Sequence, residues 1–324
     1  MSNRNIAVLI MSALAWLATM TPLPAADRLP AEDTDPVGVV QTIDDHQRVV
    51  SETIRTLSRR MDRMFGTTET LPDEVYDSML RLRFIQRVDE GGGGDFEFGA
   101  GGVLSLPGTE RRLSLVFISD DYDDPVARER GTERELEDPT RRSLALRLLR
   151  PPDPWGSDFS VGLRSGDPID VLTRVRGWRD FDVGDLRLRP GQSLFWYDQG
   201  GVGTATDLRV ERPLASTRML MRSHTRVTWF KREGQFYYDQ VFSLLQPLAH
   251  RRDLLWQIGV QGESEPNDRV TRYYAQVRWR SVLHRDWLIA ELRPQALHER
   301  ENDFRTQWRL YFGIELLFGD PQHY

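Results

Sequence analysis

The sequence predicts an all-β protein, an antiparallel transmembrane β-barrel of roughly 12 to 14 strands preceded by one amphipathic α-helix. Three observations support this prediction. From about Ser78 onward, apolar side chains recur at every second position, which is the period of a β-strand. Turn sequences such as EGGGGD and SGDP separate segments of about ten residues, the length that tilted strands need to cross a bilayer. Tryptophans stand near the ends of the apolar faces, as in interface girdles.

The first part of the chain indicates export. Residues 1–26 combine Arg4, an apolar run and a pair of alanines, the pattern of a secretory signal peptide, with a retained anchor as the alternative. The chain has no cysteine, so the exported fold is not held by disulfides. We assign residues 27–77 to a linker and a periplasmic amphipathic helix, and residues 78–324 to the barrel.

A seven-residue spacing predicts one helix from about Val39 to Phe65. The apolar positions on its one side are Ile43, Val50, Ile54, Leu57, Met61 and Met64, and several arginines lie on the other side. Three interpretations fit this pattern: a periplasmic helix that binds a partner or self-associates, a helix that enters and plugs the barrel, and a longer coiled coil.

The barrel strands follow from Met79 to the closing stretch TQWRLYFGIELLFG. That stretch places Trp308, Leu310, Phe312, Ile314, Leu316 and Phe318 on one face, against Arg309, Tyr311, Gly313 and Glu315 on the other. Between Trp155 and Tyr197 the pattern is ambiguous, because LRLRPGQSLFWY fits either one bent strand or two. The longest connection, residues 120–141, is expected outside the cell, which requires an even number of strands and both chain ends on the periplasmic side.

The closing strand resembles the C-terminal assembly signal of bacterial outer-membrane barrels. Together, HRDWLIAELRPQ, ENDF and ELLFG are similar to uncharacterised Gram-negative outer-membrane β-barrel proteins with an N-terminal periplasmic segment. The resemblance covers about residues 78–319. It implies the fold, an outer-membrane location with both termini periplasmic, and contact with outer-membrane lipid and with the barrel-assembly machinery. It implies no catalytic residue.

A soluble β-sandwich also alternates, but here the polar face is crowded with Arg, Glu, Gln and Gly, and the strands are long. We predict a set of membrane-interface aromatics on the apolar face. They are Trp196, Trp229, Trp256, Trp279, Trp287, Trp308 and Phe318.

The polar face supplies the candidate pore-lining residues. They are Arg81, Arg83, Glu97, Arg174, Arg176, Arg222, Arg226, Arg278, Arg280, Glu291, Arg309 and Glu315. Rings of arginine favour anions. The alternative is a structural network in which these arginines pair with carboxylates such as Asp170 and fill a narrow barrel.

Other chemistry has weaker support in the sequence. A hydrolase needs a nucleophile and a base within reach, yet Ser223 and His224 are adjacent on a strand and face opposite sides. His250, His284 and His298 fall in predicted turns. The acidic run of residues 120–124 lacks the spacing of a calcium loop. We therefore expect no metal and no cofactor.

The leading functional hypothesis is a narrow pore or passive transporter for small solutes, with anions favoured by the arginines. The second is a structural or scaffold barrel that does not conduct, in which residues 39–65 bind a periplasmic partner or another copy. An outer-membrane hydrolase is third. A nucleic-acid partner is not expected, because the arginines are spread among acidic residues and the net charge is −6.

Overall fold

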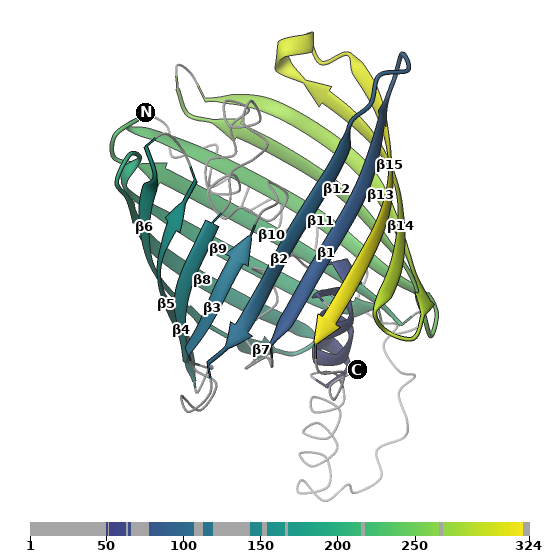
Figure 1. The fold of residues 1–324 in the computed structure, drawn as a ribbon, viewed down its shortest axis with the longest axis horizontal. Coiled ribbons are helices and arrows are strands. Elements are labelled where there is room, and N and C mark those ends of the chain that lie inside the picture. Colours follow the sequence, from purple (N-terminus) through teal and green to yellow (C-terminus); the bar gives the residue numbers. More distant parts are fainter. Residues whose placement is uncertain are drawn as a thin grey trace, which may run out of the picture.

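The computed structural model describes residues 50, 52–62, 64–65, 78–106, 113–118, 143–150, 154–165, 168–214, 218–265 and 268–319. Antiparallel strands dominate this part of the chain (Figure 1). The strands are β1 (Met79–Asp89), β2 (Phe96–Ser105), β3 (Leu113–Ile118), β4 (Ser143–Arg150), β5 (Trp155–Arg164), β6 (Asp170–Arg179), β7 (Phe181–Val183), β8 (Leu186–Tyr197), β9 (Gly201–Leu214), β10 (Met219–Phe230), β11 (Gln235–Ala249), β12 (Arg252–Glu263), β13 (Arg269–His284), β14 (Leu288–Glu299) and β15 (Thr306–Gly319). A short 3₁₀ helix, η3 (Arg300–Asn302), precedes β15.

The strands form a closed ring. Strand β1 pairs with β2 on one side and with β15 on the other, so that Met79 lies opposite Gly319. Strands β6 and β7 both pair with β8 and are separated only by Asp180, so they act as two segments of one strand. The ring therefore contains 14 strands, and the predicted barrel is confirmed. Closure matters because each of the 14 strands then has a hydrogen-bonded neighbour on both sides, although among the described residues the segment β7 pairs on one side alone.

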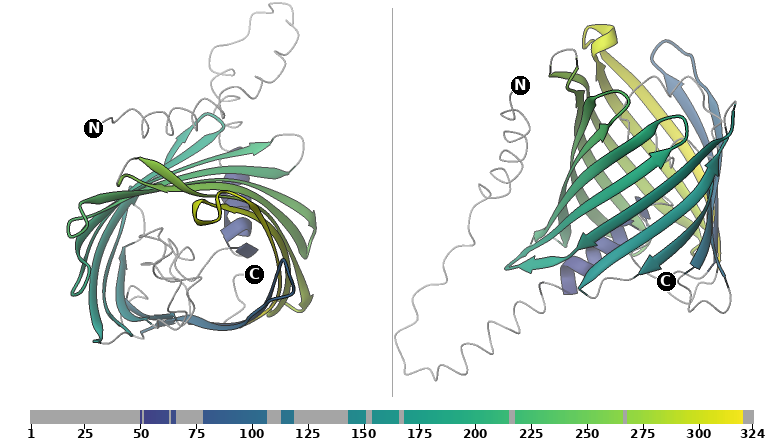
Figure 2. Two further views of the ribbon diagram at one scale, coloured as in Figure 1. Left: turned by 90° about the horizontal axis from the view of Figure 1, so that it is seen from above. Right: turned by 90° about the vertical axis from the view of Figure 1, so that its left-hand side faces the viewer.

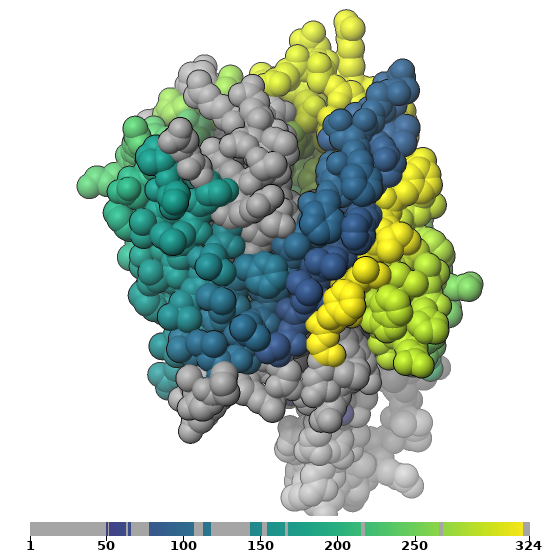
Figure 3. Space-filling model, in the orientation of Figure 1, coloured from purple at the N-terminus to yellow at the C-terminus, as the bar shows by residue number. Residues whose placement is uncertain are grey.

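The alternation in sequence becomes an inner and an outer face. On β15, Trp308 and Phe312 are exposed on the outside, while Glu315 is buried on the inside. Side chains of β1, β2 and β15 lie together on one outer surface (Figure 3). Large exposed apolar residues elsewhere on the outside include Leu144, Leu146, Leu148, Phe159, Val161, Leu163 and Ile258. An exposed apolar belt around a closed barrel suits contact with lipid.

The predicted aromatics divide between the two rims. We call the end where β1 begins and β15 ends the C-terminal rim, and the other end the opposite rim. Trp196, Trp229 and Trp308 lie near the opposite rim, and Trp256, Trp279, Trp287 and Phe318 lie nearer the C-terminal rim. All face outward or lie in a turn, and Trp229 and Trp279 are half-buried while the others are exposed. Their role at the membrane interface remains a prediction. The prediction omitted Phe96, Trp155 and Tyr273, which are also exposed.

One helix packs inside the ring near the C-terminal rim (Figures 1 and 2). It covers residues 52–62, and Val50, Met64 and Phe65 are also helical. Its buried apolar side chains form one cluster with the inner wall. The members are Ile54, Leu57, Met61, Met64, Phe65, Leu220, Leu245 and Leu255. The second of the three interpretations, a helix that enters the barrel, therefore describes its position.

Several predicted segments lie outside the described residues: the signal peptide, the linker, residues 39–49 of the helix and the acidic run at 120–124. The ambiguous stretch LRLRPGQSLFWY is a single strand, β8. Ile118 and Ser143, which flank the longest connection, both lie at the opposite rim, as the parity argument requires. Among the described helical residues, none forms a helix long and apolar enough to cross a membrane.

Candidate functional site

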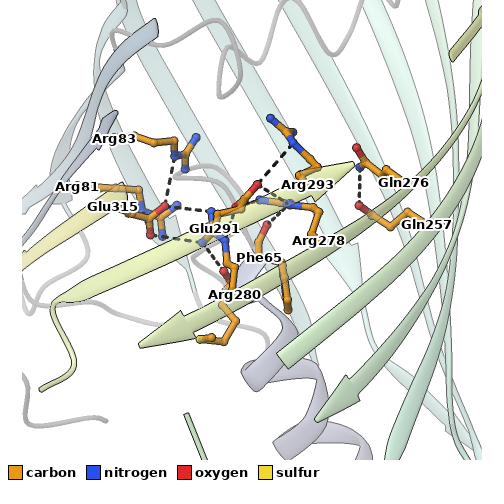
Figure 4. A network of polar contacts seen from close by, with 11 residues as sticks. Phe65, Arg81, Arg83, Gln257, Gln276, Arg278, Arg280, Glu291, Arg293 and Glu315 are labelled. Atoms are coloured by element: carbon orange, nitrogen blue, oxygen red, sulfur yellow. Dashed lines mark hydrogen bonds and ion pairs between the residues drawn. The ribbon is translucent and has the colours of Figure 1, made fainter. Parts of the chain in front are cut away.

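The inner wall carries a cluster of arginines around Glu291 and Glu315, which we call the two-glutamate cluster (Figure 4). Its members come from β1, β13, β14 and β15. They are Arg81, Arg83, Arg278, Arg280, Arg293, Glu291 and Glu315. Adjacent strands bring them together because every one occupies an inward position of its strand. Five guanidinium groups thus gather around these two carboxylates.

Glu315 is the centre of one half of this cluster. Its Oε2 atom lies 3.2 Å from Arg83 Nε and 3.2 Å from Arg280 Nη2, and its Oε1 atom lies 3.4 Å from Arg81 Nε. All four side chains are at most 5% exposed. A carboxylate buried this deeply needs such partners, because a buried charge without a partner destabilises a protein by several kcal/mol.

Glu291 is the centre of the other half. Its Oε2 atom accepts a hydrogen bond of 2.9 Å from Arg278 Nη2 and another from Arg280 Nε. Arg293 Nε lies 3.5 Å from Glu291 Oε1. The guanidinium of Arg293 also stacks over the ring of Tyr311, 3.9 Å from its centroid. Arg280 joins both halves, so the whole cluster is one connected network.

The same arginines hold the C-terminal end of the helix. Arg278 Nη1 donates a hydrogen bond of 3.2 Å to the carbonyl oxygen of Phe65, and Arg280 Nη1 donates to that of Met64. The last carbonyls of a helix have no partner within the helix and carry partial negative charge, so cations are favoured there. The inner wall therefore binds the carbonyl oxygens of the last described helical residues.

A second set of contacts holds the middle of the helix. Arg222 donates hydrogen bonds of 2.6 Å to both Asp62 and Glu211, and 2.9 Å to Ser58. Arg60 forms a pair with Asp253, a wall carboxylate that is 1% exposed. Burial favours the neutral form of Asp62, but Arg222 and Arg209 outweigh it and hold the pKa of Asp62 below its ordinary value.

A third cluster lies across the ring, on β4, β5 and β6. Asp158, which is buried, lies 3.1 Å from Arg147 and 3.9 Å from Arg174. Arg176, on the next inward position, places its guanidinium over the ring of Trp178. This cluster lies on the wall that faces the two-glutamate cluster.

A neutral feature, the glutamine ladder, crosses five neighbouring strands. It consists of Ser243, Gln257, Gln276, Gln295 and Tyr311. Gln295 donates to Gln276 at 3.1 Å, Gln276 donates to Gln257 at 2.8 Å, and Gln257 donates to Ser243 at 3.1 Å. The hydroxyl of Tyr311 donates to Gln295 at 3.3 Å. Gln257, Gln276 and Gln295 are directly paired across β12, β13 and β14, so the ladder follows the strand register.

The remaining predicted lining residues are also on the inside, and most have a charged partner. Arg226 pairs with Asp207 at 2.7 Å, and Arg309 lies 3.4 Å from Asp89. Glu97 lies 3.7 Å from Arg87. Asp170, which the structural alternative included, pairs with Arg164 at 3.2 Å. The structure thus gives these arginines carboxylate neighbours and gathers several guanidiniums in each of two clusters.

The hydrolase candidates do not come together. Ser223 accepts a hydrogen bond from Gln240 on the outer side of β10, whereas His224 contacts Asp207 on the inner side. Among the described residues, no group of three or more potential metal ligands is present.

Sequence reasoning missed two sets of inward residues. Asp207, Arg209 and Glu211 lie in VGTATDLRVERPL, where charges alternate at every second position, and that signal could have identified them. Of the ladder glutamines, alternation places Gln257 and Gln276 on the polar face, whereas Gln295 was missed. The alignment of all three across strands depends on register, which the sequence pattern does not specify.

Comparison with known proteins adds no family. No family model matches the chain, and no curated protein matches it by sequence. Solved structures that resemble it include the KdgM porin in complex with disordered oligogalacturonate (8% identity, TM-score 0.38, covering 74% of this chain and 99% of that one). A loop-deletion mutant of OmpT from Vibrio cholerae gives 10% identity and a TM-score of 0.45, covering 75% of this chain and 98% of that one. CdiB from Acinetobacter baumannii gives 10% identity and a TM-score of 0.49, covering 75% of this chain and 60% of that one.

These TM-scores lie below 0.5, and the fold given above rests on the strand pairing of the chain itself. The architecture implied by the sequence resemblance, a β-barrel of the outer-membrane type, is confirmed.

Proposed function

We propose that the protein is a narrow outer-membrane pore or passive transporter for small solutes, with a preference for anions. The observation that carries this proposal is the two-glutamate cluster, where five guanidiniums on the inner wall share two carboxylates. Arginine remains charged at any physiological pH, and arginines gathered on the wall of a pore favour anions over cations.

The helix makes the proposed pore narrow. It packs on the inner wall formed by β9 to β13 and is fixed there by both apolar and charged contacts. The helix thus takes up part of the lumen near the C-terminal rim, which is what would narrow the pore.

The proposal includes an orientation. The C-terminal rim would face the periplasm, because the helix follows directly on an exported N-terminal segment and the long connection leaves from the opposite rim. The exposed apolar belt would contact outer-membrane lipid, and β15 would be recognised by the barrel-assembly machinery.

The test is charge selectivity in a planar bilayer. We expect the folded protein to give a conductance in which chloride is more permeant than potassium. Arg81→Gln combined with Arg83→Gln should shift the permeability ratio towards unity, because two positive charges leave the inner wall. Arg150→Gln is the matched control, since Arg150 is exposed and takes an outward position at the end of β4.

A second candidate function is a barrel that does not conduct and acts as a scaffold, with residues 39–65 binding a periplasmic partner or another copy. The observation that favours it is the extent to which the lumen near the C-terminal rim is filled by the helix and its ion pairs. Conductance separates the two. A scaffold stays silent in the bilayer even when the helix is released by substitution, and deletion of residues 39–65 removes its partner.

A further inference from the structure

We propose that the glutamine ladder is a binding track for saccharides, so that the solutes of the proposed pore include short hydroxyl-rich carbohydrates. This inference rests on the proposed function and specifies its substrate class. It follows from the hydrogen-bonding capacity that the ladder leaves unused, from its regular spacing and from the side chains that border it.

Each carboxamide of the ladder has spare capacity. A glutamine side chain offers two N–H donors and an oxygen with two lone pairs. Gln276 uses one donor towards Gln257 and one lone pair towards Gln295. Gln295 likewise uses one donor towards Gln276 and one lone pair towards Tyr311. A donor and an acceptor therefore remain on each amide, held in a fixed orientation by the ladder. A hydroxyl group both donates and accepts, so it matches this pair.

The ladder is also accessible and regular. Gln257, Gln276, Gln295 and Tyr311 are only half-buried, although they lie on the inner wall. Because they sit on adjacent strands in register, the amides repeat at the spacing of neighbouring strands, about 4.8 Å. A repeat of neutral donor and acceptor pairs can contact successive hydroxyls of a chain of sugar rings without binding any one of them tightly, which suits a solute that must leave again.

An aromatic side chain lies at each border of the ladder. Towards the C-terminal rim, the buried Arg293 stacks on the ring of Tyr311, whose hydroxyl belongs to the ladder. Towards the opposite rim, the ring of Tyr274 lies over Gly259, where any Cβ atom would collide with it. The track thus runs between the ring of Tyr274 and the stack of Arg293 on Tyr311.

The test measures saccharide binding directly, and also as a decrease in the current through the open pore. Folded protein in detergent is titrated calorimetrically with maltotriose and with glucuronic acid, and the same sugars are added to open channels in a planar bilayer. We expect both to bind. Gln276→Met, which keeps the volume but removes the amide, should weaken binding by about fivefold to tenfold, the effect of one or two hydrogen bonds.

Gln192→Ala is the control. Gln192 is exposed on the outer face of β8, where it bonds to Thr204 and Thr206, so its loss removes a similar hydrogen-bonded amide without touching the lumen. Retention of the folded, heat-modifiable band on gels shows that each variant is intact. Gln276→Arg keeps a polar side chain at the site and tests the position if Gln276→Met fails to fold, and it should favour the acidic sugar over maltotriose more strongly than the wild type does.

Two results would overturn the inference: no calorimetric binding of either sugar to the folded wild type, or equal binding by wild type and Gln276→Met. Failure of the proposed pore looks different. A protein that binds maltotriose through Gln276 but never conducts keeps the ladder as a saccharide site and removes the pore. A protein that conducts chloride but binds no sugar keeps the pore and removes the saccharide track.

Discussion

Docking of the helix inside the barrel gives the sharpest prediction. Ile54 is 1% exposed and packs in the apolar cluster with Leu220, Leu245 and Leu255. Ile54→Ala should cost about 2–5 kcal/mol of docking free energy, the range for truncating a buried aliphatic side chain. The population with the helix released should rise by about 30-fold to a few thousand-fold, since each 1.4 kcal/mol is a factor of ten.

Limited trypsin digestion measures the population with the helix released, because the helix contains its own cleavage sites. Arg60 is engaged with Asp253 when docked and becomes accessible on release. If the helix recloses faster than it is cleaved, the rate of cutting after Arg60 follows the released fraction. Thr56→Ala is the control, since Thr56 is an exposed position of the same helix. Equal cleavage rates for Ile54→Ala and Thr56→Ala would refute the docked position of the helix.

Three further predictions follow from the closed ring and its ion pairs. Phe84 and Ile314 face each other across β1 and β15, so Phe84→Cys with Ile314→Cys should form a disulfide in this cysteine-free chain. The disulfide would be seen as a difference in gel mobility of the boiled protein with and without reductant. Phe84→Cys with Leu163→Cys should not cross-link, and cross-linking of both pairs alike would contradict the ring order. The pKa of Asp62 is held below its ordinary value, so its ionised side chain stabilises the docked helix at pH above about 4, and this stabilisation is lost as pH falls further through the folded-state pKa. A fluorophore attached to Thr56→Cys should report release of the helix on acidification. Asp62→Asn should weaken docking at neutral pH and reduce the response of the fluorophore to acid. Glu315→Gln should destabilise the barrel by about 3–5 kcal/mol, because three buried guanidiniums lose their shared carboxylate. The temperature at which the folded gel band disappears should therefore fall. Glu301→Gln, at an exposed position of η3, should leave that temperature unchanged.

The faces of the strands could be predicted from the sequence because the period of two is a local property. Arg81, Arg83 and Glu315 were assigned to one face by alternation alone, and they meet inside the barrel. The strand over residues 186–197 was ambiguous because Pro190 and Gly191 resemble a turn. The structure keeps them in one continuous strand that pairs with β9 along its length, and the break falls instead at Asp180 between β6 and β7.

The contacts of the helix could not be predicted in the same way. Its apolar spacing shows that Leu57 and Met61 must pack against something, but the partner, Leu245 and Leu255, is nearly 200 residues away. The alignment of the glutamine ladder could not be predicted either, because it also depends on how distant segments of the chain come together. Gln257, Gln276 and Gln295 align only because two hairpins set a particular register, and a shift of one residue would turn each of them to the lipid face.

The sign of the reversal potential tests the central claim most directly. The folded protein is placed in a planar bilayer between unequal concentrations of potassium chloride, and the voltage of zero current is measured. An inner wall on which guanidiniums gather predicts the sign set by chloride, and a smaller value in Arg81→Gln with Arg83→Gln. A potential with the sign set by potassium, or no current from any folded preparation, would contradict an anion-preferring pore.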